Sequence, residues 1–135
     1  MCSFPTRFLL VEIPTKKSGI LTYMKRLTRA QSGLTAKEYK TLAKLRTPIK
    51  IQDFLDAIPM NWEKKGDTHM SPRRVLQTGK AHCIEGALLA ATALWIQGES
   101  PLIMNLSARF GRGDCDHVIT LYKRGGYFGA ISKTN

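Results

Sequence analysis

Residues 80–97 read KAHCIEGALLAATALWIQ, and this stretch decides how the rest of the chain can fold. The part Cys83–Gln97 contains no proline and mostly strong helix formers, and Gly98 follows where helices commonly end. These features predict a helix. Only Glu85 and Thr92 interrupt its apolar surface. Because a helix that is apolar on nearly all sides is normally buried, we expect the other elements to pack around this one.

Cys83 stands in the first turn of the predicted helix. The unpaired N–H groups of a helix start and the positive end of the helix dipole favour a negative charge there, so they stabilise a thiolate. A thiolate is a nucleophile, whereas a cysteine on an apolar helix is most often a small buried hydrophobic residue. Both interpretations stay open on this stretch alone.

Length and composition bound the class of protein. A chain of 135 residues with 43% hydrophobic content is typical of one folded domain. No apolar run approaches the about 18 residues of a membrane helix, so no membrane partner is expected. The three cysteines, Cys2, Cys83 and Cys115, are not spaced like a disulfide framework. We therefore expect reduced thiols and a cytoplasmic location.

The positive charge is distributed unevenly. Residues 1–80 hold 16 Lys/Arg and 6 Asp/Glu, a net of +10, whereas residues 81–135 hold 5 and 4, a net of +1. Such asymmetry suits a surface that binds nucleic acid or an acidic partner. Because the basic residues are spread out and no aromatic platform is interleaved with them, a solvated basic face is favoured over a polyanion-binding protein.

Helical patterns come before Gly98 and strand patterns dominate after it. We expect helices at 20–30, 35–46, 48–58, from 71 to about 78 and at 83–97, and strands at 4–13, 102–108, 117–123 and 127–132. A hairpin turn at 124–126 joins the last two strands. Helices followed by antiparallel strands predict an α+β fold, with the buried helix lying against a small sheet.

A nucleophilic cysteine needs a base within hydrogen-bond reach, and His117 at the head of a predicted strand is the candidate. The segments His82–Ala87, Asp116–Val118 and Gly129–Asn135 together resemble the transglutaminase-like cysteine proteinase superfamily, in particular its bacterial members.

Upstream, Ile51–Pro59 and Ser71-Pro72 also resemble that group, so the resemblance covers residues 47–135 as a core domain. Residues 1–46 are then expected to form a basic, mainly helical extension. Because the chain ends at Asn135 with no further core element, a shortened member is expected.

The resemblance implies a papain-like or transglutaminase-like α+β fold with Cys83 as nucleophile, His117 as base, and neither metal nor cofactor. Such folds attack an amide or ester carbonyl of a peptide or protein substrate through an acyl-thioester, which water or an amine resolves. The Cys83 backbone N–H would face the oxyanion. Gln77, six residues before Cys83, has the offset of the oxyanion glutamine in papain-like enzymes.

The third member of the triad departs from the family, because the usual Asp position holds Ser132. A hairpin with an Arg124-Gly125 loop would place His117 opposite Ser132, whereas a Gly125-Gly126 loop would place it opposite Thr134. Neither residue is a carboxylate.

Asn135 and Asp116 are two further polar residues to compare with Ser132 as the group that orients His117. Asn135 can orient an imidazole through its side-chain oxygen, as in papain-like triads, whereas Asp116 would point to the opposite face of the strand from His117. Either Ser132 or Asn135 therefore orients His117, or the protein is a catalytically idle binding module.

Other polar residues near Cys83 have simpler interpretations. His82 is a weaker second candidate for the base, because adjacent helical residues face different directions. A zinc site formed with Cys115 lacks CxxC or HxxxH spacing. Glu85 in a buried helix needs a partner, and a structural hydrogen bond is favoured over catalysis.

Overall fold

The predicted central helix is present as α5, Cys83–Gln97, in the computed structural model. The structure describes residues 25–64, 66, 68–109 and 115–134. Within these residues the remaining elements are α1 Arg29–Ser32, α2 Ala36–Ala43, α3 Pro48–Ala57, α4 Pro72–Thr78, β1 Leu102–Leu106, β2 His117–Arg124 and β3 Tyr127–Ser132. Helices followed by a three-stranded antiparallel sheet confirm the α+β class.

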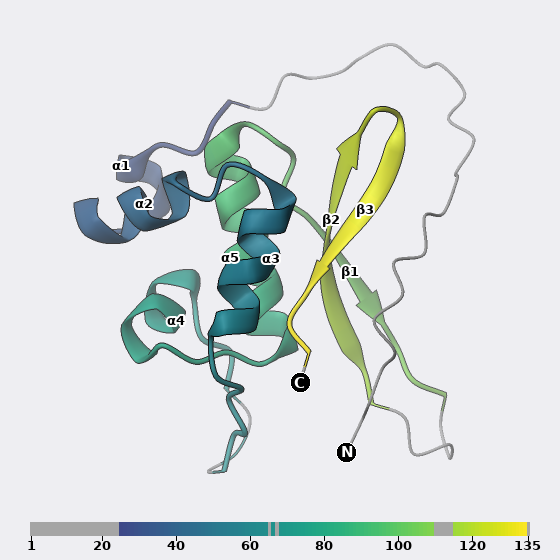
Figure 1. Ribbon diagram of the computed structural model, residues 1–135. Coiled ribbons are helices and arrows are strands. Elements are labelled where there is room, and N and C mark those ends of the chain that lie inside the picture. The colour runs from purple at the N-terminus through teal and green to yellow at the C-terminus, as the bar shows by residue number, and fades with distance from the viewer. Residues whose placement is uncertain (1–24, 65, 67, 110–114, 135) are drawn as a thin grey trace.

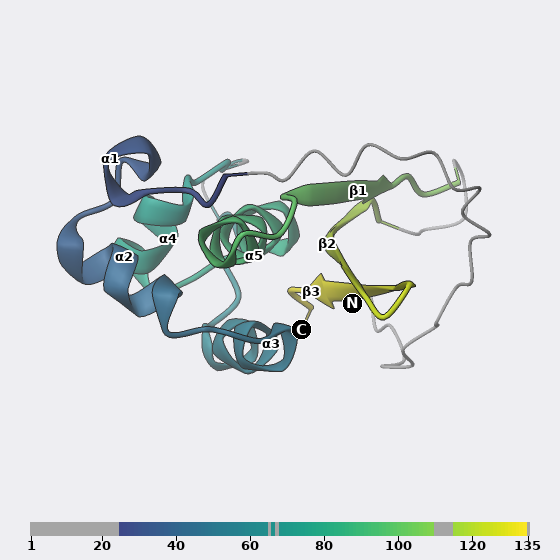
Figure 2. The same ribbon diagram turned by 90° about the horizontal axis from the view of Figure 1, so that it is seen from above.

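The helix α5 lies between a helical layer and the sheet. Figures 1 and 2 show α1, α2 and α4 on one side of it, the strands on the other, and α3 running alongside. Leu89 and Leu94 of α5 are completely buried, as the apolar surface of the helix predicts. Within the described ranges, no helix combines the length and apolar character needed to cross a membrane.

Hydroxyl side chains mark the starts of the other helices. Thr28, Thr35, Thr47 and Ser71 each accept a hydrogen bond from a backbone N–H in the first turn of the helix that follows. The predicted starts of α2, α3 and α4 are confirmed, and α2 and α3 end before the predicted residues 46 and 58.

The predicted helix at 20–30 is wrong over residues 25–28, and of its described residues only the last two, 29 and 30, are helical. Residues 25–28 are not helical, and α1 begins only at Arg29. The physical reason is a competing partner, because the Leu27 N–H donates to the Trp95 carbonyl at the end of α5, 3.2 Å away. The predicted strand at 4–13 lies outside the described residues.

The hairpin between β2 and β3 selects one of the two predicted registers. Arg124 pairs with Tyr127, so Gly125 and Gly126 form the loop, and both have positive φ (59° and 87°) that glycine adopts readily. Ile119 consequently pairs with Ser132.

The sheet is held on α5 by close contacts at one end of the helix. The buried hydroxyl of Thr120 donates to the Ala87 carbonyl at 2.6 Å, and Ile131 of β3 is buried in the core. A Cβ on Gly86 would lie 2.5 Å from the Lys133 Cβ, so the residue after β3 sits directly on the first turns of α5. Leu27, Leu34 and Leu42 from the N-terminal part join the same core cluster.

Candidate functional site

Cys83 is the first residue of α5 and is partly exposed. Its Sγ lies 3.9 Å from Nδ1 of His82, the residue that precedes the helix. The first turn of a helix presents backbone N–H groups that have no partner within the helix. Cys115, by contrast, is exposed and lies ahead of β2.

His117 at the start of β2 contacts Ser132 at the end of β3. The distance from His117 Nε2 to Ser132 Oγ is 2.7 Å. Because Ile119 is the residue paired with Ser132, His117 reaches it diagonally across the two strands, along the same face of the sheet. In this register His117 would lie opposite Thr134, and its imidazole nevertheless contacts the hydroxyl of Ser132.

Ser132 is itself held by α3. Its N–H donates to Gln52 Oε1 at 3.0 Å, and its carbonyl accepts from Gln52 Nε2 at 2.8 Å. These two bonds fix the backbone that carries the hydroxyl. The imidazole of His117 thus meets a group whose position is set by a helix and a strand together.

The elements that carry Cys83, His117 and Ser132 meet at one end of the contact between α5 and the sheet. Lys133 follows Ser132 and lies on Gly86, which is three residues after Cys83 in α5. Figure 1 shows the start of α5, the start of β2 and the end of β3 toward the same end of the molecule.

Burial lowers the pKa of His117, because its charged form loses hydration. The ring therefore stays neutral at a lower pH than an exposed histidine, and a neutral imidazole can accept a proton. This protonation state suits a general base at neutral pH.

Glu85 is completely buried and richly hydrogen-bonded, which confirms the expectation that it has structural partners. Its Oε1 accepts from Thr68 Oγ1 at 2.7 Å and from the Met70 N–H at 3.0 Å, and its Oε2 accepts from the His82 N–H at 3.0 Å and from Asn61 Nδ2 at 3.2 Å. Burial raises the pKa of Glu85, but these donors outweigh burial and the pKa is lowered overall.

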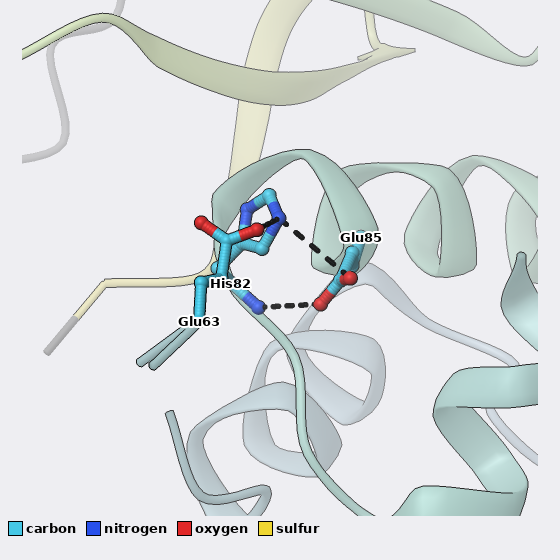
Figure 3. Close-up of side chains that lie close together, drawn as sticks. All are labelled: Glu63, His82 and Glu85. Atoms are coloured by element: carbon cyan, nitrogen blue, oxygen red, sulfur yellow. Dashed lines mark hydrogen bonds and ion pairs between the residues drawn. The ribbon is translucent and has the colours of Figure 1, made fainter. Parts of the chain in front are cut away.

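The loop of residues 61–70, which supplies hydrogen-bond donors to Glu85, also holds the imidazole of His82 (Figure 3). Its Nε2 lies 2.7 Å from the Thr68 carbonyl, 2.9 Å from Glu63 Oε1 and 3.6 Å from Glu85 Oε1. Burial opposes the charged form, yet the Thr68 carbonyl, Cys83 and the two carboxylates together raise the pKa of His82. The Thr68 N–H is the main reason that the pKa of Glu63 is lowered.

Glu63, His82 and Glu85 each offer a ligand atom, and these atoms lie within 4.8 Å of one another. The chemistry of the cluster is nevertheless that of a hydrogen-bond network. Carboxylate oxygens accept from Thr68, and the imidazole nitrogen faces a carbonyl. In the described part of the chain, every buried side-chain nitrogen and oxygen has a hydrogen-bond partner. Hydrogen bonds therefore account for the way these three side chains are arranged.

Of three other predicted residues, two are described and have partners of their own. Gln77 is exposed on α4, where its amide donates to Glu38 and accepts from Arg74, so its described contacts do not include Cys83. Asp116 accepts from the Ala108 N–H at 2.7 Å. Asn135 lies outside the described residues.

Sequence reasoning missed the loop residues Asn61, Glu63 and Thr68. They belong to a polar stretch without helical or strand periodicity, and it is expected only to be a loop. The available signal was indirect: a glutamate on an otherwise apolar helix requires donors from another part of the chain.

Comparison with known proteins leaves the site to be interpreted from its geometry: no family model matches the chain, and no curated protein matches it. The transglutaminase-like resemblance therefore stays a prediction from the motifs.

Proposed function

We propose that the protein is a thiol-dependent enzyme of the transglutaminase-like type that hydrolyses or transfers an acyl group of a peptide or protein substrate, with Cys83 as nucleophile and His117 as base. The observation that carries this proposal is the 2.7 Å contact between His117 Nε2 and Ser132 Oγ. It lies at the end of the sheet that packs on the first turns of α5. Thiol catalysis requires an oriented imidazole within reach of the cysteine, and the proposal assigns that task to His117.

The proton and electron movements in such a reaction balance with these residues alone. The Cys83 thiol gives its proton to His117 Nδ1, and the sulfur attacks the carbonyl carbon while the C=O electron pair moves to oxygen. The Cys83 backbone N–H at the helix start would donate to that oxyanion. The leaving group takes the proton from the imidazolium and departs, which leaves an acyl-thioester. Water or an amine then attacks the thioester, and its proton returns to Cys83 through His117.

Ser132 would act as a positioning residue. Its contact with Nε2 directs Nδ1 as the nitrogen that serves the thiol, and Gln52 keeps the hydroxyl in place. A hydroxyl lacks the negative charge of the usual Asp, so it orients the ring without stabilising the imidazolium as strongly.

The test is acylation of Cys83 by an activated ester. The full chain is incubated with p-nitrophenyl acetate, release of p-nitrophenolate is followed, and the acyl adduct is located by peptide mass spectrometry. We expect the adduct on Cys83 in the wild type, loss of release in Cys83→Ala, and a decrease of about 100-fold or more in His117→Gln. Cys115→Ala is the matched control and should behave like the wild type. Release that persists unchanged in Cys83→Ala would overturn the proposal.

The second candidate is a catalytically idle module that binds a protein partner. Ser132 in place of a carboxylate favours it, because the imidazolium formed during catalysis has no charged partner there. A folded wild-type protein that forms no acyl adduct at Cys83 would support the idle module. Polyanion binding rests on net charge alone and would require affinity that falls steeply with salt.

A further inference from the structure

We propose that a second imidazole, that of His82, serves Cys83 as a fixed positive charge that donates Nδ1–H to the thiolate and is anchored by Glu63. This inference rests on the proposed function, in which Cys83 is the nucleophile. It adds a second histidine with a task different from that of His117.

The tautomer of His82 follows from its neighbours. A carbonyl oxygen can only accept, and the Thr68 carbonyl lies 2.7 Å from Nε2, so Nε2 carries a hydrogen. The Glu63 carboxylate at 2.9 Å reinforces that assignment. The other ring nitrogen, Nδ1, is then the one directed at Cys83 Sγ, 3.9 Å away. Proximity along the chain alone does not produce this geometry, because it is the loop contact at Nε2 that fixes the ring.

Negative charge around the ring supports the charged form of His82. Two carboxylates, Glu63 and Glu85, approach Nε2, and both keep their charge through hydrogen bonds to the loop (Figure 3). The pKa of His82 is raised, so the imidazolium persists closer to neutral pH than that of an exposed histidine. The titratable and charged groups facing this region are Glu63, His69, Cys83 and Glu85 around the ring, with His117 and Lys133 on the sheet side of α5.

The two histidines are thereby set to different protonation states. His117 is partly buried at the start of β2 and has a lowered pKa, whereas His82 sits among acceptors and has a raised one. Environments that separate two pKa values in this way are a common means of dividing roles within one site. His117 moves the proton, and His82 keeps its proton and stabilises the sulfur anion.

The experiment is the pH profile of iodoacetamide alkylation at Cys83, followed by peptide mass spectrometry in the full chain. His82→Gln keeps an N–H for the Thr68 carbonyl but removes the charge, and we expect the midpoint of the profile to rise by about 1–2 pH units. Glu63→Gln should raise it in the same direction by less. His69→Gln is the matched control, because that ring lies 6.4 Å from the His82 ring, is exposed and has no described contact with Cys83; its profile should match the wild type.

A reciprocal measurement protects the test against loss of folding in His82→Gln. By linkage, removal of the thiolate must lower the pKa of His82, so the NMR titration of His82 should move to lower pH in Cys83→Ser. An unchanged midpoint in a folded His82→Gln variant, or an unchanged His82 titration in Cys83→Ser, would overturn the inference.

Failure of this inference and failure of the proposed function are distinguishable. If Cys83 forms an acyl adduct but the midpoint of its alkylation profile is unchanged in His82→Gln, only the role of His82 is refuted. A midpoint that depends on His82 without any acyl adduct supports the charge pair and removes the enzymatic function.

Discussion

At the scale of single residues, the side chain at position 132 decides how strongly His117 is oriented. Ser132 offers a hydroxyl at 2.7 Å, and Gln52 holds the backbone on both sides of it. His117 Nε2 therefore meets a neutral hydroxyl and not a carboxylate. Replacing the Ser132 hydroxyl with a carboxylate tests whether a negative charge at this position matters.

Ser132→Asp should raise the pKa of His117 by about one unit or more, because a carboxylate would lie beside Nε2. If His117 is the base, the rate of acyl release should rise about tenfold, and Ser132→Ala should lower it by a similar factor. NMR titration of His117 and p-nitrophenolate release measure the two effects. Ser107→Ala, an exposed serine whose described side-chain bond is to Asn105, is the control. An unchanged His117 titration in Ser132→Asp would show that the contact is absent in solution.

At the scale of elements, the contact between α5 and the end of β3 depends on a missing side chain. Gly86 is buried at the end of the first turn of α5, inside a helix, where glycine normally costs stability relative to alanine. Lys133 explains the exception, because its Cβ lies only 2.5 Å from where a Cβ of residue 86 would be. The absent side chain lets the end of the sheet approach the first turns of α5.

Gly86→Ala should therefore destabilise the protein by about 1–3 kcal/mol, although alanine favours a helix by about 1 kcal/mol. Urea unfolding measures the change. The contact is with Cβ, so Lys133→Gly should relieve most of the cost in a double variant, whereas Lys133→Ala keeps Cβ and should not. Equal costs in both backgrounds would contradict this account of the packing.

At the scale of the whole molecule, the polar cluster around Glu85 links stability to pH. Glu63 and Glu85 both have lowered pKa values, so they contribute stability above the unfolded pKa of about 4.3, and this is lost as pH falls through the folded values. The stability that His82 contributes depends on pH in the opposite direction. Its raised pKa contributes stability below the unfolded value of about 6.5, and this is lost as pH rises through the folded value.

Glu85→Gln should lower the free energy of unfolding at pH 7 by about 1–3 kcal/mol, because an amide NH₂ cannot accept from the surrounding donors. It should also flatten the loss of stability below about pH 5, since one of the titrating carboxylates is gone. Urea unfolding over a pH series measures both effects. Glu99→Gln is the control: it removes a surface ion pair with Arg124, and such pairs contribute about 0–1 kcal/mol. An acid limb as steep in Glu85→Gln as in the wild type would contradict the assignment.

The elements and the class of fold were predictable because their signals are local. The start and end of α5 follow from residues within it and from Gly98, and the starts of α2, α3 and α4 follow from hydroxyl caps. Where a distant partner competes, local signals fail. The predicted helix before Arg29 is absent over residues 25–28 because the Leu27 backbone pairs with the end of α5.

The sequence by itself determined the buried helix with Cys83 at its start, the α+β order of elements, and Cys83, His117 and Ser132 as residues worth comparing. Tertiary structure alone decided the register of β2 and β3, the diagonal contact of His117 with Ser132, and the partners of His82 and Glu85. The physical reason is the distance along the chain between the residues that interact. Helix formation depends on neighbours a turn away, whereas the loop around Thr68 reaches α5 only after both have packed in the core.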